Sequence, residues 1–289
     1  MELVNKIRSY LEFQVFERAT KSWKKMYKNV VKFNKDFYEM IELNYVEIIA
    51  GLIKEDFDPS SNDDVAIFDA SGHGRTEVVK LLLQDPRVDP GSKDNSPLML
   101  DSAYGHVEVV KLFLKDPRVD IHARNDEAIL FAADNGHVEI VKLLIDNGLN
   151  PSVDGNEALI ESSRMGHIEV VKLLLKDPRV DPSPDNQALV EASGRGHLEI
   201  VKLLLEDPRV DPSDDDNFVI RIASEEGHLE VVKLLLEDPR VDSSDDFNTA
   251  IWSAYNNSHK NVVEFLLQDP RVRNGLTGDK LEIFEKFIL

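Results

Sequence analysis

The chain of 289 residues contains no cysteine, and this absence removes several kinds of chemistry at once. Without thiols there is no disulfide framework, no thiolate metal site and no cysteine nucleophile, and the lack fits a reducing compartment. No apolar run approaches the ~18 residues that a membrane-spanning helix needs. The first residues also lack the basic start and apolar core of a signal peptide. We therefore expect a cytoplasmic protein with no membrane segment.

Positive charge is in short supply. The chain has 34 Lys and Arg against 54 Asp and Glu, which gives a net charge of −20. A general nucleic-acid binder needs cations for the phosphates, so this balance excludes that class. Apolar residues make up 42% and charged residues 30% of the chain, a composition typical of a folded protein.

One phrase recurs along nearly the whole chain. It reads GHLEIVKLLLEDPRVDPS where it opens at Gly196, and its copies start 30 or 31 residues apart. The eight copies open at Asn44, Gly74, Gly105, Gly136, Gly166, Gly196, Gly227 and Ser258. A near-constant period of this length predicts a solenoid of stacked units that share one core. Because capped ends leave no open face to pair, we expect a monomer.

Each unit has the pattern of two short helices and a turn. The V-V-K-L-L-L run places apolar residues on one helical face, and a second helix precedes each glycine. The glycine stands where the chain leaves the first helix, and Asp-Pro-Arg ends the second because proline cannot continue it. The sequence predicts an all-α solenoid with a repeat array at 36–274, a non-repeat segment at 1–35 and a C-terminal capping half-repeat at 275–289.

The string G-H-x-E-V-V-K-L-L-L, preceded by two small residues, resembles the ankyrin repeat. This resemblance implies a non-catalytic scaffold that binds a protein on a concave face made by the first helices. The units are shorter than the family period of about 33 residues, so we expect tighter fingers between repeats. The D-P-R-V-D-P style is also similar to ankyrin arrays of giant DNA viruses and protists. That similarity implies a viral host-interaction protein in the host cytoplasm.

The first 35 residues allow two interpretations. They carry nine Lys or Arg and three Glu, a net charge of 9 − 3 = +6, which is typical of a solvated basic helix that caps an acidic array. They are also similar to an F-box, through the S-Y-L element and a later K-x-W-like element. This second similarity implies a substrate-recruiting adaptor of a cullin-type ubiquitin ligase. Its adaptor contacts would be Leu3, Ile7, Leu11 and Trp23.

The positions that vary between repeats are candidates for binding a partner. In ankyrin-like arrays these lie five, two and one residues before the junction glycine. Here they place aromatic, Met and Arg side chains in successive units, which is the composition of a binding hot spot. The predicted partner-binding residues are Leu100, Tyr104, Phe131, Asn135, Glu161, Arg164, Met165, Glu191 and Arg195. We expect Arg164 and Arg195 to orient the partner through a carboxylate. The alternative is that the apolar members belong to the core.

The recurrent polar residues all have an explanation within the repeat. Six of the eight histidines stand at the helix junctions, about one repeat apart, too far from one another to share a zinc ion. We interpret them as structural, and we interpret the arginines beside Asp-Pro as neutralised by neighbouring aspartates. The sequence thus predicts no enzyme, no metal site and no cofactor. Asp101 replaces the Ala of other repeats, so it is either paired or marks a shifted helix.

Overall fold

The computed structural model describes residues 37–241, 246–276 and 278–289. Within these residues every regular element is a helix, which confirms the predicted all-α class. The chain divides into two compact units, Met1–Arg124 and Asn125–Leu289, each considered by itself below. The segment 1–35, with the predicted adaptor contacts Leu3, Ile7, Leu11 and Trp23, lies outside the described residues.

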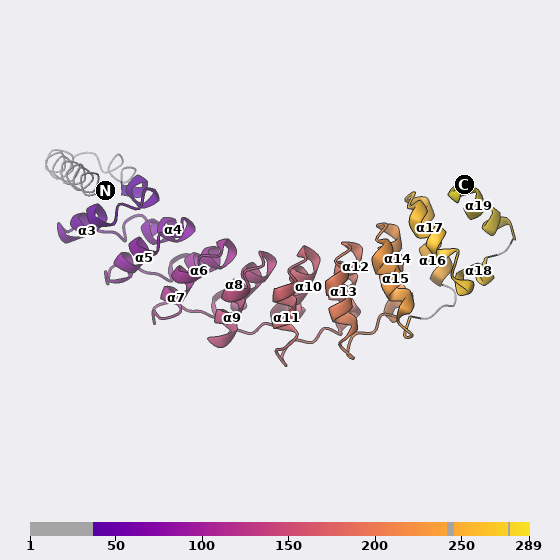
Figure 1. Cartoon of the computed structure of the whole chain (residues 1–289). Coiled ribbons are helices and arrows are strands. Elements are labelled where there is room, and N and C mark those ends of the chain that lie inside the picture. Colours follow the sequence, from indigo (N-terminus) through magenta and orange to yellow (C-terminus); the bar gives the residue numbers. More distant parts are fainter. Residues whose placement is uncertain (1–36, 242–245, 277) are drawn as a thin grey trace, which may run out of the picture. The chain divides into compact units, whose positions relative to one another are not determined.

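Helix pairs build both units (Figure 1). In unit 1 a helical stretch at 37–42 is followed by α3 (Val46–Lys54), α4 (Val65–Gly72), α5 (Thr76–Leu83), α6 (Ser92–Tyr104) and α7 (Val107–Phe113). Helix α8 (Ala123–Asp134) begins with the last two residues of unit 1 and continues in unit 2. Unit 2 further contains α9 (Val138–Asp146), α10 (Val153–Met165), α11 (Ile168–Leu174), η1 (Pro184–Asn186), α12 (Gln187–Gly194), α13 (Leu198–Leu205), α14 (Asp214–Glu225), α15 (Leu229–Glu237), α16 (Asp246–Asn256), α17 (Lys260–Leu266), α18 (Pro270–Gly275) and α19 (Gly278–Ile288). The first helices α10, α12, α14 and α16 pack in one row, and the second helices α9, α11, α13, α15 and α17 in another.

The second helices carry the core. In α11 the side chains of Val170, Val171 and Leu174 are buried, as the helical spacing of the V-V-K-L-L-L run predicts. Lys172 points away from this face and lies 2.7 Å from Glu169, one turn earlier. Exposed pairs of this kind stabilise a helix by only about 0.2–0.5 kcal/mol, so the stability of the array rests mainly on the buried aliphatic face.

The junction glycines and histidines act together. Gly196 adopts a φ of +74°, and a Cβ there would lie 2.5 Å from Nδ1 of His228 in the next repeat. His228 in turn places Nε2 3.0 Å from the carbonyl oxygen of Gly194. Nε2 of His167 makes the same contact with the backbone carbonyl of Asp134, and Nε2 of His197 with the backbone carbonyl of Arg164. These three histidines therefore tie each repeat to the preceding one through its backbone, which confirms their structural interpretation.

The fingers between repeats are short left-handed turns. In unit 2, Asp154, Gly155 and Asn156 have positive φ values in succession, a conformation that Asn, Asp and Gly tolerate best. Asn156 is buried and its Oδ1 accepts a hydrogen bond from the backbone N–H of Asp181 at 3.1 Å. Other repeats use Asn95, Asn186, Asp64 and Asp126 in the same way. One side chain thus caps the loop of the following repeat, and this compact turn accounts for the short period.

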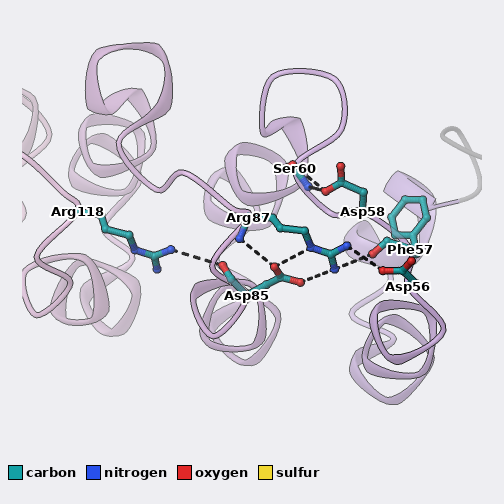
Figure 2. A network of polar contacts seen from close by, with 7 residues as sticks. All are labelled: Asp56, Phe57, Asp58, Ser60, Asp85, Arg87 and Arg118. Atoms are coloured by element: carbon teal, nitrogen blue, oxygen red, sulfur yellow. Dashed lines mark hydrogen bonds and ion pairs between the residues drawn. The ribbon is translucent and has the colours of Figure 1, made fainter.

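Each Asp-Pro-Arg element joins two repeats, and Figure 2 shows the one at Asp85 and Arg87. Arg87 donates from Nε and Nη2 to the two carboxylate oxygens of Asp85, at 2.9 and 2.7 Å, and from Nη2 to the carbonyl of Phe57 in the preceding repeat. Arg118 reaches the carbonyl of Val88 in the same manner, at 2.8 Å. The hydrogen-bonded guanidinium lowers the pKa of the partner aspartate below its ordinary value in each element. The aspartates concerned are Asp85, Asp116, Asp177, Asp207, Asp238 and Asp269.

We expect Arg240→Ala to lower the free energy of unfolding by about 1–2 kcal/mol, since it removes hydrogen bonds to Asp238 and to the carbonyls of Val210 and Leu205. Partial exposure of Arg240 keeps the loss below that of a buried ion pair. The matched control is Arg273→Ala, which removes only an exposed pair with Glu285 and should cost less than about 0.5 kcal/mol. Urea denaturation measures both, and equal losses would contradict a role of Arg240 in joining repeats.

Asp101 is paired and does not mark a shifted helix. Its side chain is fully buried in α6, and Oδ1 lies 2.9 Å from Nδ1 of His106. Burial raises the pKa of Asp101, while the hydrogen bond with His106 and the nearby hydroxyl of Ser71 act in the opposite direction. The hydrogen bond that His106 donates to Asp101 raises the pKa of His106 above 6.5. Unit 1 therefore pairs the buried Asp101 with a partly buried His106, where most other repeats have alanine and one has Ser162.

Aromatic packing closes the C-terminal end of unit 2. Phe284 of α19 is fully buried, with its ring centroid 4.6 Å from that of Trp252 and 5.4 Å from that of Tyr255. Phe287 packs on Tyr255 as well, at 4.8 Å. Helix α19 thus covers side chains of α16. The role of residues 275–289 as a capping half-repeat stays a prediction, and this packing supports it.

Candidate functional site

The first helices of unit 2 present one continuous row of side chains, which we call the first-helix face. It consists of the outward positions of α10, α12 and α14, since consecutive first helices pack against one another. The variable residues stand five, two and one positions before each junction glycine. Positions three to four residues apart share a helix face, so each helix brings its variable side chains to the same side.

A groove lies on this face between α12 and α14. Its volume is about 420 Å³, and its lining residues are Val190, Glu191, Gly194, Arg195, Phe218, Ile222 and Glu226. Val190, Phe218 and Ile222 are half-buried and give the groove its apolar part. Gly194 keeps it open, because a Cβ at that position would lie 3.1 Å from Cγ1 of Ile222. An apolar hollow with a few charged groups at its edge is the usual make-up of a binding site.

Charged groups of both signs border the groove. Arg195 is exposed, and its side chain makes no hydrogen bond or ion pair with the other residues that the structure describes. Glu191 and Glu226 are the two carboxylates of the lining. The guanidinium of Arg221 lies beside the groove, 4.6 Å from the ring centroid of Phe218. Arg195 is therefore available to an external acceptor.

Arg164, predicted to orient the partner, is already engaged within α10. Its Nε donates to Oε2 of Glu161 at 2.7 Å, and Nη2 donates to the same oxygen. Oδ1 of Asp134 lies 3.7 Å from Nη2 of Arg164. A guanidinium held by two carboxylates of its own unit offers little to a partner, so of the two predicted arginines only Arg195 keeps its hydrogen-bonding capacity free.

The predicted apolar cluster is divided between the two units. Tyr104 in unit 1 and Met165 in unit 2 are exposed, with relative accessibilities of 60% and 46%. The alternative that these two belong to the core is therefore wrong. Leu100 and Phe131 are half-buried, and Leu100 packs over Gly72, where a Cβ would lie 2.9 Å from its Cδ2.

Asn135, also predicted to contact a partner, is exposed but donates from Nδ2 to the carbonyl of Phe131 at 2.9 Å. It therefore caps the end of its own helix. Glu161 is half-buried and engaged with Arg164. Glu191 and Arg195 are thus the predicted residues that the structure brings together at the groove.

Comparison with sequence models of protein families identifies the repeat. The ankyrin-repeat model matches three times, over residues 37–125, 98–187 and 189–276. These matches cover most of the chain. The chain belongs to the ankyrin-repeat family. No curated protein matches it, so the similarity in style to viral and protist ankyrin arrays stays a prediction.

Most of the groove of this ankyrin array is absent from the predicted partner-binding residues. Gly194, Ile222 and Glu226 stand at variable positions, but the predicted aromatic and Met side chains lie in units closer to the N-terminus. The sequence signal for the groove is the combination of Gly194, two residues before the junction Gly196, with Ile222, five residues before the next junction Gly227. Val190 and Phe218 carried no such signal, because they lie outside the three variable positions.

Other candidate sites of the ankyrin array are weaker. Among the described residues, no group of three or more His, Asp or Glu side chains has the arrangement of a metal site. The aspartates Asp214, Asp215 and Asp216 stand at a finger tip. In the same part of the chain, none of the helices has the length and apolar character needed to cross a membrane.

Proposed function

We propose that this chain is a non-catalytic scaffold whose protein partner docks on the first-helix face of unit 2, centred on the groove between α12 and α14. Ankyrin repeats are general protein–protein interaction modules, and the matches span most of the chain. The observation that carries the proposal is the exposed, unpaired Arg195 beside an apolar hollow. An apolar centre with an arginine at its edge is the composition of a binding hot spot.

Preorganisation supports this assignment. The groove lies between two helices whose opposite faces are packed in the core, with Ala192, Ala223 and Leu189 fully buried or nearly so. The junction histidine His228 also fixes the end of α12 by its bond to Gly194. A surface held in this way loses little conformational freedom when a partner binds, and that raises affinity for a given contact area.

We expect Ile222→Lys to abolish capture of the partner, because a cation replaces an apolar side chain inside the groove. The loss should exceed about tenfold in bound partner, or about 1.4 kcal/mol. The measurement is quantitative mass spectrometry of proteins retained from the native host by the wild-type chain and by the variant.

Glu199→Lys is the matched control, since Glu199 is exposed on α13 in the row of second helices and also becomes a lysine. It should retain the partner. Circular dichroism must show that both variants melt near the wild-type temperature. Equal retention by wild type and Ile222→Lys would contradict the proposed face.

A further inference from the structure

The groove between α12 and α14 also restricts which chemistry its partner presents. Val190, Phe218 and Ile222 leave apolar surface half-exposed at its centre. Covering that surface with an apolar side chain removes it from water and is favourable, whereas a charged side chain placed there would lose its hydration without gaining a partner. The centre of the groove therefore selects an apolar residue.

The edge of the groove selects a carboxylate. Three arginines stand on the first-helix face of unit 2. Arg164 is paired with Glu161, Arg221 stacks over the ring of Phe218, and Arg195 is the one that lines the groove. Within the described residues Arg195 has no such partner. A guanidinium binds a carboxylate through two parallel hydrogen bonds, which fixes both position and direction.

The acidic residues of the groove and of the whole chain determine which charge the rest of the partner protein should carry. Glu191 and Glu226 line the same groove, and the chain as a whole has a net charge of −20. An acidic partner would be repelled over most of its approach, and a basic one attracted. The same repulsion excludes a nucleic acid as the occupant.

We infer that the groove binds a segment of a partner protein that presents an apolar side chain with one carboxylate beside it on an otherwise basic surface. The apolar side chain lies over Phe218 and Ile222, and Arg195 holds the carboxylate. This inference rests on the proposed function, because it specifies the partner of the same face.

The test uses a random peptide library displayed on phage and selected against the full-length wild-type chain. The selected peptides should share an apolar residue near an Asp or Glu, with Lys or Arg enriched elsewhere. Arg195→Glu should weaken these peptides by about tenfold or more, because repulsion replaces an ion pair. Changing the peptide carboxylate to Lys should restore binding to Arg195→Glu and weaken binding to wild type.

Two glycine variants locate the binding. Gly194→Ala adds a methyl group inside the groove and should weaken the peptides. Gly72→Ala is its matched control, because Gly72 holds the same repeat position in unit 1 and packs under Leu100 as Gly194 packs under Ile222. It should leave binding unchanged. Melting curves of both variants show whether folding is retained.

The outcomes separate this inference from the proposed function. Peptides that respond to Gly194→Ala but not to Arg195→Glu, or that lack a carboxylate, overturn the inference and leave the docking face in place. Peptides that respond neither to Gly194→Ala nor to Ile222→Lys overturn both. Failure to select any peptide at low and at physiological salt also contradicts the inference.

Discussion

Gly196→Ala should destabilise the protein by about 2–3 kcal/mol, a large effect for one methyl group. The first cause is the backbone, because φ at Gly196 is +74° and a left-handed conformation costs an L-residue about 1–2 kcal/mol. The second cause is the neighbouring imidazole of His228. A Cβ would lie 2.5 Å from Nδ1 of His228, so the imidazole must move and lose its bond to the carbonyl of Gly194, worth about 1 kcal/mol.

The array provides a control that separates the two causes. Gly155 has a similar φ of +70°, but a Cβ there would meet nothing within 4 Å. Gly155→Ala should therefore show the backbone cost alone, about 1–2 kcal/mol. The double variant Gly196→Ala/His228→Ala removes the clash. Urea denaturation of the single and double variants gives the coupling energy, and additive losses would show that the glycine and the histidine do not act together.

Much of the fold could be predicted because its determinants repeat. The burial of Val170, Val171 and Leu174 follows from helical spacing that recurs in every unit. The structural function of the junction histidines follows from their period. The sequence does not show which backbone carbonyl accepts the hydrogen bonds of each arginine in the Asp-Pro-Arg elements. That Arg118 reaches the carbonyl of Val88 depends on how far the left-handed finger turns, and no local pattern encodes that distance.

The candidate site was harder to predict because it depends on exceptions to the repeat. Arg164 was expected to face a partner, although Glu161 stands three residues earlier on the same helix and binds it. That pairing was readable from the sequence spacing. The groove was not, since it requires the missing side chain of Gly194 to coincide with Ile222 of the next repeat. The variable positions predict the first-helix face, whereas the groove on that face depends on contacts between side chains of successive repeats.

The pair formed by Asp101 of α6 and His106, the residue before α7, gives the last expected result. His106→Ala should lower the stability at neutral pH by about 2–3 kcal/mol, because it leaves the carboxylate of Asp101 buried and unpaired. The loss lies below that of a fully buried pair, since the imidazole side chain is one-quarter exposed. Asp101→Ala introduces the alanine that most other repeats have and should keep stability close to that of wild type at mildly acidic pH. Thermal melting of both variants measures this contrast.

The same pair makes stability depend on pH. Both pKa values are raised in the folded state, that of Asp101 above 3.8 and that of His106 above 6.5, although Arg75 acts against the second. The native protein therefore holds these protons more tightly than the unfolded chain does.

The contribution of His106 to the free energy of unfolding is complete below pH 6.5. It is lost as the pH rises through the folded-state pKa of His106, at up to about 1.4 kcal/mol per pH unit for one proton. Asp101→Ala should thus gain stability relative to wild type as the pH rises from 6.5 through the folded-state pKa of His106. In the acid range the Arg-bound aspartates act with the opposite sign, because their lowered pKa values make stability fall as pH falls. Urea midpoints of wild type and Asp101→Ala that stay parallel above neutral pH would show that the pair does not bind protons in this way.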